Sequence, residues 1–595
     1  MRTPSEIHRA VSYRAVKLNL PWNSYRVHPS LTQHAATMER PEFWDRLIGF
    51  LSDCGFNALT LWSIHPWSFM VRPPSFPEAC PFDDRELDRW QSLWRGVFRI
   101  GRERGVEIVP VCFNIFVSPE LARARGLAPY SADLSCGYNG PGDYSAEVRA
   151  YNREIVSEVL RAYPDIGGIG VSQNERMEGV SLEAWQRWIV ETYFELAGRY
   201  LQDKTFIVRC HTRPTPSLTR EAIESYPGRL PDRTLVDVKF NWSHGHATPE
   251  FHYMHEGDDG TALREPVPTR YKLVYTVRNE DFFGLDYGSI SFMQDLIRAN
   301  ASPRTAGFII GSECLIPAKE YIVRPRGGPA WDYLYQRQPL FWIGWGTVLA
   351  DPDADRETVA AKLDALAERH CGGRLADPLT LLEACDLACR TANRVAASIA
   401  STWDFTLYSE GLIKGARQDW FGQPFDDTSP LISVSELVHA RPLDPEWAPV
   451  GAWVDDPTVS GSVTPPDRIA ELRRDGTRAL ELLGRLDATE PASMLDAYER
   501  ACARAWALLG LCFADRLAAA IACARSRSFA GSLRAARSNY AELCAVLDPW
   551  IPQPYELLHL GDNYIRETFR HPMAKFNHRG VLSLMDEELR RLEAR

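Results

Sequence analysis

The sequence has little of what marks a nucleic-acid-binding or membrane protein. It contains no basic run, and 67 Lys and Arg against 78 Asp and Glu give a formal net charge of -11. A net negative charge disfavours binding to nucleic acid phosphates. Residues 1–8 lack the apolar core of a signal peptide, and no uninterrupted apolar stretch reaches the roughly 18 residues that span a bilayer. We therefore expect a cytoplasmic protein that binds neither nucleic acid nor a membrane.

Paired cysteines and phosphate loops are also missing. The 13 Cys are an odd number without a C-x-x-C pair, and several lie in apolar runs, where they act as small buried hydrophobic residues. A disulfide framework is therefore not expected. No Gly-rich phosphate loop follows the first apolar run, which disfavours the alternative of a doubly wound open sheet. A chain of 595 residues with 45% hydrophobic residues predicts a globular protein of at least two domains.

Eight short apolar runs alternate with amphipathic stretches in residues 1–330. Near-continuous apolar runs of this length are typical of strands buried on both faces, and the stretches between them have helical periodicity. Eight strand-then-helix units predict a (β/α)8 TIM barrel, of the α/β class. The runs are 15–20, 57–62, 106–113, 166–171, 206–209, 235–240, 272–277 and 307–311.

Helical periodicity dominates the chain beyond residue 330, where strand-like runs disappear. We expect an all-α C-terminal domain over 331–595, with an irregular, Pro- and Asp-rich insertion near 423–465. This domain is a candidate surface for a homodimer. It is also a candidate wall of the pocket, through Trp403, Asp404 and Tyr408.

Polar or aromatic residues follow every predicted strand, where (β/α)8 enzymes carry their catalytic groups. Asn174 and Glu175 follow the fourth run, and Glu280 follows the seventh. Two carboxylates are the minimum requirement for glycoside hydrolysis. We therefore predict Glu175 as the general acid or acid/base and Glu280 as the nucleophile or base. Asp281 and Glu313 are alternatives for the second role.

Amides, indoles and cations at the strand ends form a predicted sugar-binding set. Aromatic faces stack on sugar rings, and Arg binds carboxylates bidentately, so a uronic acid would suit the cations. The alternative is that these cations pair with carboxylates of the protein, such as Asp237. The predicted substrate-binding residues are Asn19, Trp22, Trp62, Asn114, Asn174, Arg209, His211, Lys239, Asn241, Trp242, His244 and Glu313.

A His-rich segment, 244–256, opens the alternative of a metal-dependent hydrolase. It holds four of the 14 His, and a His-x-His pair is able to ligate a metal. Metal hydrolases on barrels need further ligands from other strand ends, where only His65 and His211 are available. We expect no metal and no cofactor.

These residues give the chain a resemblance to the α-glucuronidases of glycoside hydrolase family 67, over residues 160–370. Glu175 matches the family's general acid, and Glu280 matches its acidic residue after the seventh strand. The segments 206–210, 238–241 and 334–353 resemble its Arg-Cys strand, its Lys-Asn strand and the helix that follows its barrel. The family's acidic residue after the sixth strand has no counterpart here.

Asn174-Glu175 together with Glu280 equally resembles the large clan of retaining (β/α)8 glycosidases. In that clan Asn-Glu supplies the acid/base, and the seventh-strand Glu is the nucleophile. Carboxyl groups about 5–5.5 Å apart indicate retention, and about 6.5–9.5 Å indicate inversion. The sequence thus predicts an exo-acting glycosidase whose substrate is an oligosaccharide. The rival prediction is a non-catalytic barrel that binds carbohydrate or serves as a scaffold.

Overall fold

The computed structural model consists of two compact units. The first comprises Met1–Asn241, Tyr253–Val277 and Ala301–Ala318, and the second comprises Trp242–His252, Arg278–Asn300 and Lys319–Arg595. The structure describes residues 11–23, 31–113, 117–127, 145–173, 180–210, 215–239, 249, 262–277, 285–311, 318–325, 330–399, 412–413, 429, 431–442, 444–458, 461–552, 555–556, 575–576 and 578–593.

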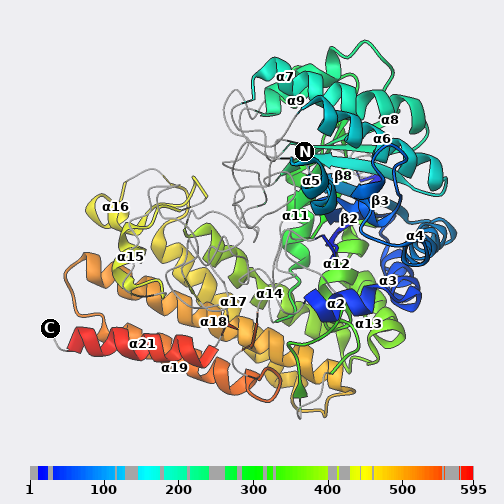
Figure 1. Ribbon diagram of the computed structural model, residues 1–595. Helices are drawn as coiled ribbons and strands as arrows, with labels where there is room; N and C mark the ends of the chain where they lie inside the picture. The colour runs from blue at the N-terminus through cyan, green and yellow to red at the C-terminus, as the bar shows by residue number, and fades with distance from the viewer. Residues whose placement is uncertain are drawn as a thin grey trace. The chain divides into compact units, whose positions relative to one another are not determined.

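Eight parallel strands of the first unit close into a barrel (Figure 1). Each predicted apolar run forms one strand, and each strand pairs with the next along the chain, while the eighth returns to the first. The prediction of a (β/α)8 barrel is confirmed. The strands are β1 (Tyr13–Asn19), β2 (Ala58–Ser63), β3 (Glu107–Phe113), β4 (Gly168–Ser172), β5 (Thr205–Cys210), β6 (Arg233–Lys239), β7 (Lys272–Val277) and β8 (Thr305–Ile310).

Amphipathic helices cover the strands of this unit from outside. In α4 the side chain of Asp83 caps the first turn by accepting from the Glu86 N–H, and Gly105 ends the helix with a φ of 69°. The helical stretch between β4 and β5 contains a π-helical turn at Val190–Phe194, between α7 and α8. The helices are α2 (Leu31–Met38), α3 (Pro41–Cys54), α4 (Asp84–Arg104), α5 (Pro119–Arg125), α6 (Ala146–Ala162), α7 (Leu182–Ile189), α8 (Glu195–Tyr200) and α9 (Thr215–Glu224).

The barrel interior is filled by alternate residues of the strands. One buried cluster joins side chains from seven strands, among them Ala15, Val111, Ile207 and Leu235, so these positions point inward. β4 contributes glycine instead. A Cβ on Gly168 would lie 1.9 Å from the carbonyl oxygen of Thr205, so only glycine fits between β4 and β5.

The second unit is built from helices, and the predicted helical C-terminal region is confirmed. A short antiparallel pair, β9 (Tyr555–Glu556) with β10 (Lys575–Phe576), adds strands where none were expected. The helices are α11 (Ile290–Asn300), α12 (Pro339–Ala350), α13 (Arg356–Cys371), α14 (Pro378–Ala397), α15 (Val434–His439), α16 (Val450–Asp455), α17 (Pro465–Leu486), α18 (Met494–Ala524), α19 (Ala530–Leu547) and α21 (His578–Glu593).

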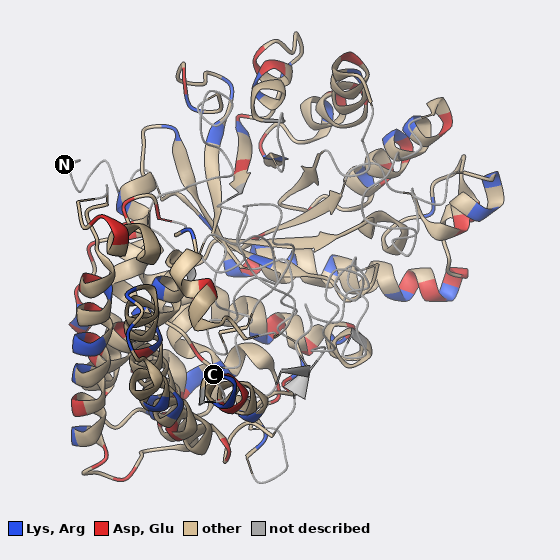
Figure 2. Cartoon of the chain, turned by 90° about the vertical axis from the view of Figure 1, so that its left-hand side faces the viewer, with Lys and Arg blue, Asp and Glu red and all other residues tan. Residues whose placement is uncertain are grey.

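The core of this unit is α18. By length and composition α18 is apolar enough to cross a membrane. Within the unit, however, it packs against α14, α17 and α19, as a core helix of a globular domain does. It also carries the buried charged residues Glu499, Arg500 and Arg516. Figure 2 shows that, among the described residues, charged residues lie mainly on the helices and few lie on the barrel strands.

Candidate functional site

Four of the predicted site residues have described side chains: Asn19, Trp22, Trp62 and Arg209. Lys239 ends β6, and its side chain is not described. The other predicted residues lie outside the described part of the chain, so their roles stay predictions. They are Asn114, Asn174, Glu175, His211, Asn241, Trp242, His244, Glu280, Asp281, Glu313, Trp403, Asp404 and Tyr408.

A row of inward-facing residues crosses four neighbouring strands at the carboxyl end of the barrel. In the strand register Phe113 on β3 lies beside Ser172 on β4, Ser172 beside Arg209 on β5, and Arg209 beside Asp237 on β6. Phe113 belongs to the interior cluster, as do Ile207 and Leu235, two residues before Arg209 and Asp237. Because strand side chains alternate, the whole row points into the barrel.

Two opposite charges of this row lie next to each other in the interior. Arg209 Nη1 is 3.5 Å from Asp237 Oδ2, and both side chains are buried. On the neighbouring β7, the Thr276 hydroxyl donates a 2.5 Å hydrogen bond to Asp237 Oδ1. β5, β6 and β7 thus place a guanidinium, a carboxylate and a hydroxyl side by side in the buried interior of the barrel.

The indole of Trp62 on β2 has two cations over its ring. Lys17 Nζ on β1 is 3.8 Å from the ring centroid, and Arg209 Cζ is 4.8 Å from it. The Trp62 Nε1–H donates a 2.9 Å hydrogen bond to the Thr60 hydroxyl, which fixes the ring plane. A desolvated cation over an indole is stabilised by about 2 kcal/mol. The aromatic ring therefore helps hold positive charge in the barrel interior.

We call the residues Lys17, Trp62, Phe113, Ser172, Arg209, Asp237 and Thr276 the polar layer. Trp62 and Arg209 were predicted from the sequence, and they meet here. Lys17, Ser172 and Thr276 were not predicted, and Asp237 was considered only as a partner for the cations. The sequence signal for these missed residues is a polar residue inside an apolar run, at a position whose side chain points into the barrel.

The Ser172 hydroxyl oxygen and Asp237 Oδ2 are buried atoms of the polar layer that have no hydrogen-bond partner among the described residues. Buried polar atoms in folded proteins normally have a partner, in the protein or in an ordered water or ligand. Ser172 and Asp237 flank Arg209 along the row, so among the described residues the layer has unused hydrogen-bonding capacity on both sides of the guanidinium.

The loop after β1 is attached to the loop after β2 just beyond the polar layer. Asn23, with a φ of 54°, donates a 2.6 Å hydrogen bond from Nδ2 to the His65 carbonyl oxygen, and the Ser63 hydroxyl donates to the Asn23 carbonyl oxygen at 2.9 Å. His65 Nε2 is 2.7 Å from the Tyr151 hydroxyl. Burial lowers the pKa of His65 to about 3, so the ring stays neutral. These bonds fix the turn that follows Asn19.

Trp22 lies on this loop in an aromatic cluster. Its ring centroid is 5.0 Å from that of Trp90 and 6.2 Å from that of Trp94, both on α4. The side chain is 7% exposed, and Nε1 has no hydrogen-bond partner among the described residues. Packing against α4 accounts for an aromatic residue at this position. A sugar-stacking role for Trp22 stays a prediction.

Metal ligands do not gather in the described part of the chain. Within it, no group of three or more His, Cys, Asp or Glu side chains is placed to hold a metal ion. The His-rich segment 244–256 lies almost wholly outside the described residues, so the metal-hydrolase alternative is not decided by this observation.

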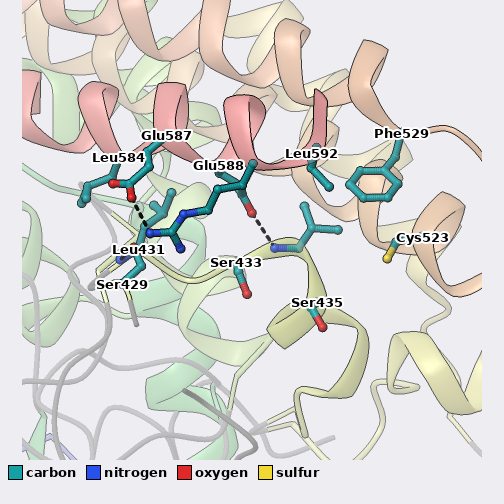
Figure 3. A pocket seen from close by; sticks show the side chains of 12 residues that line it. Ser429, Leu431, Ser433, Ser435, Cys523, Phe529, Leu584, Glu587, Glu588 and Leu592 are labelled. Atoms are coloured by element: carbon teal, nitrogen blue, oxygen red, sulfur yellow. Dashed lines mark hydrogen bonds and ion pairs between the residues drawn. The ribbon is translucent and has the colours of Figure 1, made fainter. Parts of the chain in front are cut away.

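The helical unit contains a separate cavity of about 460 Å³, beside α15 and α21 (Figure 3). Its polar groups are largely engaged with one another. Glu588 accepts a 2.9 Å hydrogen bond from the Val434 N–H, Ser433 caps α15, and Glu587 pairs with Arg591. Among its described lining residues, the cavity has no buried unsatisfied group like those of the polar layer, so the polar layer is the better candidate site.

No family model and no curated protein matches the chain. Solved structures do match. A glycoside hydrolase family 138 (GH138) enzyme targeting pectin rhamnogalacturonan II is 15% identical, with a TM-score of 0.72 over 98% of this chain and 67% of that chain. The chain therefore has the fold of this enzyme.

Two further matches are more distant. The O-GlcNAc hydrolase of Thermobaculum terrenum is 12% identical, with a TM-score of 0.37 over 96% of this chain and 94% of that chain. The GH20 β-N-acetylhexosaminidase of Streptomyces coelicolor is 11% identical, with a TM-score of 0.34 over 61% of this chain and 69% of that chain.

Proposed function

We propose that the protein is a glycoside hydrolase that acts from the end of an oligosaccharide. The observation that carries this proposal is the polar layer, a buried cation–indole–carboxylate cluster at the end of the barrel where enzymes of this fold place their active sites. The fold shared with the GH138 enzyme supports it. In this proposal Glu175 protonates the leaving oxygen, and Glu280 attacks the anomeric carbon or activates a water molecule.

The substrate in this proposal carries a carboxylate, as a uronic acid does. Lys17 and Arg209 both lie over the Trp62 ring, so two cations converge on the centre of the polar layer. A sugar carboxylate interacts favourably with such cations, and a guanidinium pairs with it through two parallel hydrogen bonds.

Three finer points belong to the same proposal. The resemblance to α-glucuronidases agrees with a uronic acid, and the Asn174-Glu175 pair favours a retaining mechanism over an inverting one. The enzyme would act in the cytoplasm on an imported oligosaccharide. The helical unit is the proposed surface for a homodimer.

The decisive experiment replaces each proposed catalytic carboxylate by its amide. Glu175→Gln and Glu280→Gln are each expected to lower kcat by about 10²–10⁴-fold on aryl glycosides and uronic-acid-containing oligosaccharides, because an amide cannot transfer the proton or form the glycosyl bond. Glu183→Gln is the matched control, since the Glu183 side chain is 83% exposed on α7. NMR of the first-formed anomer separates retention from inversion.

Three results would count against the proposal. Undiminished turnover in both amide variants would remove Glu175 and Glu280 from the mechanism. A wild-type protein that binds oligosaccharides in calorimetry but cleaves none of a broad panel would instead be a carbohydrate-binding barrel. Stoichiometric zinc or manganese in elemental analysis, with activity lost on chelation, would favour a metal-dependent hydrolase.

A further inference from the structure

We infer that Asp237 is a positioning residue that holds the Arg209 guanidinium over Trp62 in the polar layer. The geometric part of this inference stands on the described residues alone, and its consequence for turnover rests on the proposed function. Asp237 is assigned no contact with reacting atoms, because its effect passes through Arg209.

Contacts from both sides determine where the Asp237 carboxylate lies. Its Oδ1 accepts the 2.5 Å hydrogen bond from the Thr276 hydroxyl, so β7 fixes one oxygen. Its Oδ2 faces Arg209 Nη1 at 3.5 Å across the β5–β6 register pair. The guanidinium carbon then lies 4.8 Å from the Trp62 ring centroid. Thr276, Asp237, Arg209 and Trp62 thus form a chain of contacts across the barrel.

A purely structural role gives no reason for charge at this position. The interior positions two residues earlier on β5, β6 and β7 hold Ile207, Leu235 and Val274, which fill the barrel without charge. Removing two charges from water is costly, and apolar replacements of a buried ion pair are often equally stable or more stable. A carboxylate here has a clear benefit if Arg209 must be held in one orientation for a ligand.

The opposite end of the same strands shows a contrasting ion pair. Arg233 at the start of β6 pairs with Glu107 at the start of β3, and their side chains are 48% and 28% exposed. Glu107 also accepts a 2.8 Å hydrogen bond from the Thr205 hydroxyl. This pair is open to solvent and lies at the amino end of the barrel, so Glu107→Gln is a matched control for Asp237→Asn.

The test combines crystal structures with kinetics of Asp237→Asn, Thr276→Val and Glu107→Gln. In Asp237→Asn the amide keeps the acceptor for Thr276 but loses the charge facing Arg209. We expect the guanidinium to leave the Trp62 ring and KM to rise about 10- to 100-fold, the range typical of outer residues that orient a ligand-binding group, with kcat changed less. Thr276→Val should show a smaller shift of the guanidinium and a smaller rise in KM, and Glu107→Gln should match the wild type in both.

The outcomes separate this inference from the proposed function. An unmoved Arg209 in the Asp237→Asn crystal structure would overturn the inference, and so would a fall in Tm with unchanged KM. A wild-type protein without any glycosidase activity would reject the proposed function only, and the position of Arg209 would still decide the role of Asp237. If Asp237→Asn does not fold, Thr276→Val carries the same test, because it keeps the ion pair and removes only the hydrogen bond to Asp237.

Discussion

The barrel and the helical unit each bury a cluster of charged residues, and the two clusters differ in how the protein satisfies them. In the helical unit Arg337 Nε donates to Glu320 Oε2 at 2.9 Å, and both side chains are fully buried. Glu320 Oε1 accepts two more hydrogen bonds, from the N–H groups of Ile322 and Val323 at 2.6 and 2.9 Å. This pair is satisfied by the protein itself.

The barrel cluster is looser. Arg209 and Asp237 approach to 3.5 Å, and Asp237 Oδ2 and the Ser172 hydroxyl have no hydrogen-bond partner among the described residues. Buried charge that the protein fully satisfies specifies a structure, whereas buried charge with unused hydrogen-bonding capacity favours a ligand. Among the described residues, the barrel cluster therefore has unused hydrogen-bonding capacity that the equally buried Arg337–Glu320 pair lacks.

A second group of buried acids in the helical unit fixes the segment that follows β7. Asp286 accepts hydrogen bonds from the N–H groups of Tyr287 and Leu340 at 2.8 and 3.1 Å, and its carbonyl oxygen accepts from Trp506 Nε1 at 2.8 Å. Burial raises the pKa of Asp286 to about 7. Burial and the nearby Asp286 raise the pKa of Glu499 well above its usual range. The two carboxyl groups therefore share a proton near neutral pH.

The largest effect on stability is expected for Arg337→Met. It leaves the Glu320 carboxylate buried without its partner, which typically costs about 3–5 kcal/mol of unfolding free energy. Urea unfolding measures this change. Arg187→Met is the control, because the Arg187–Glu183 pair on α7 is 56% and 83% exposed and such pairs contribute about 0–1 kcal/mol. A loss of unfolding free energy below 1 kcal/mol for Arg337→Met would show that the Arg337–Glu320 pair does not stabilise the fold, and the contrast with the barrel cluster would then not hold.

The second-largest effect is expected for Glu499→Gln, as a change in how the free energy of unfolding depends on pH. Folding raises the pKa of Glu499, so its carboxyl group contributes stability that is fully present below its unfolded pKa and is lost as the pH rises toward the raised value. The amide introduced by this substitution would still donate to Asp286 but carries no charge. The difference in unfolding free energy between pH 5 and pH 8 should therefore be smaller in Glu499→Gln than in the wild type. Parallel pH profiles would disprove the shared proton.

The smallest effect on stability is expected for Lys17→Met in the barrel. The methionine keeps the apolar stem over Trp62 and removes a cation–π interaction of about 0.5–2 kcal/mol. On an acidic substrate KM should rise by about tenfold, because one of the two cations over Trp62 is lost. Steady-state kinetics on acidic and neutral aryl glycosides measures the contrast. An equal rise in KM on both substrates would argue against recognition of a carboxylate.

The sequence predicted the barrel well because its signal is local. Each apolar run became one strand, with bounds shifted by only a few residues, as β2 shows: the run 57–62 forms Ala58–Ser63. Helical periodicity between the fourth and fifth runs did not show the π-helical turn at Val190–Phe194, since periodicity does not register one extra residue in a turn. The short β9–β10 pair was missed because two-residue strands have no period to detect.

The site was predicted less completely. Arg209 and Trp62 were found because they end apolar runs, and the structure brings them together. Lys17 was not predicted, because it is a single polar residue within an apolar run. The sequence also places α11 among the barrel residues, because it lies between β7 and β8. In the structure α11 belongs to the helical unit, because it contacts α12 and α14, which come later in the chain.

The sequence by itself thus determined the number, order and type of the barrel strands, because apolar periodicity acts over a few neighbouring residues. Only the tertiary structure decided which polar residues share the interior. Arg209 and Asp237 are 28 residues apart, and the pairing of β5 with β6 sets them side by side. Strand register depends on the closure of the whole barrel. No local sequence pattern therefore predicts that a carboxylate on one strand will lie beside a guanidinium on the next.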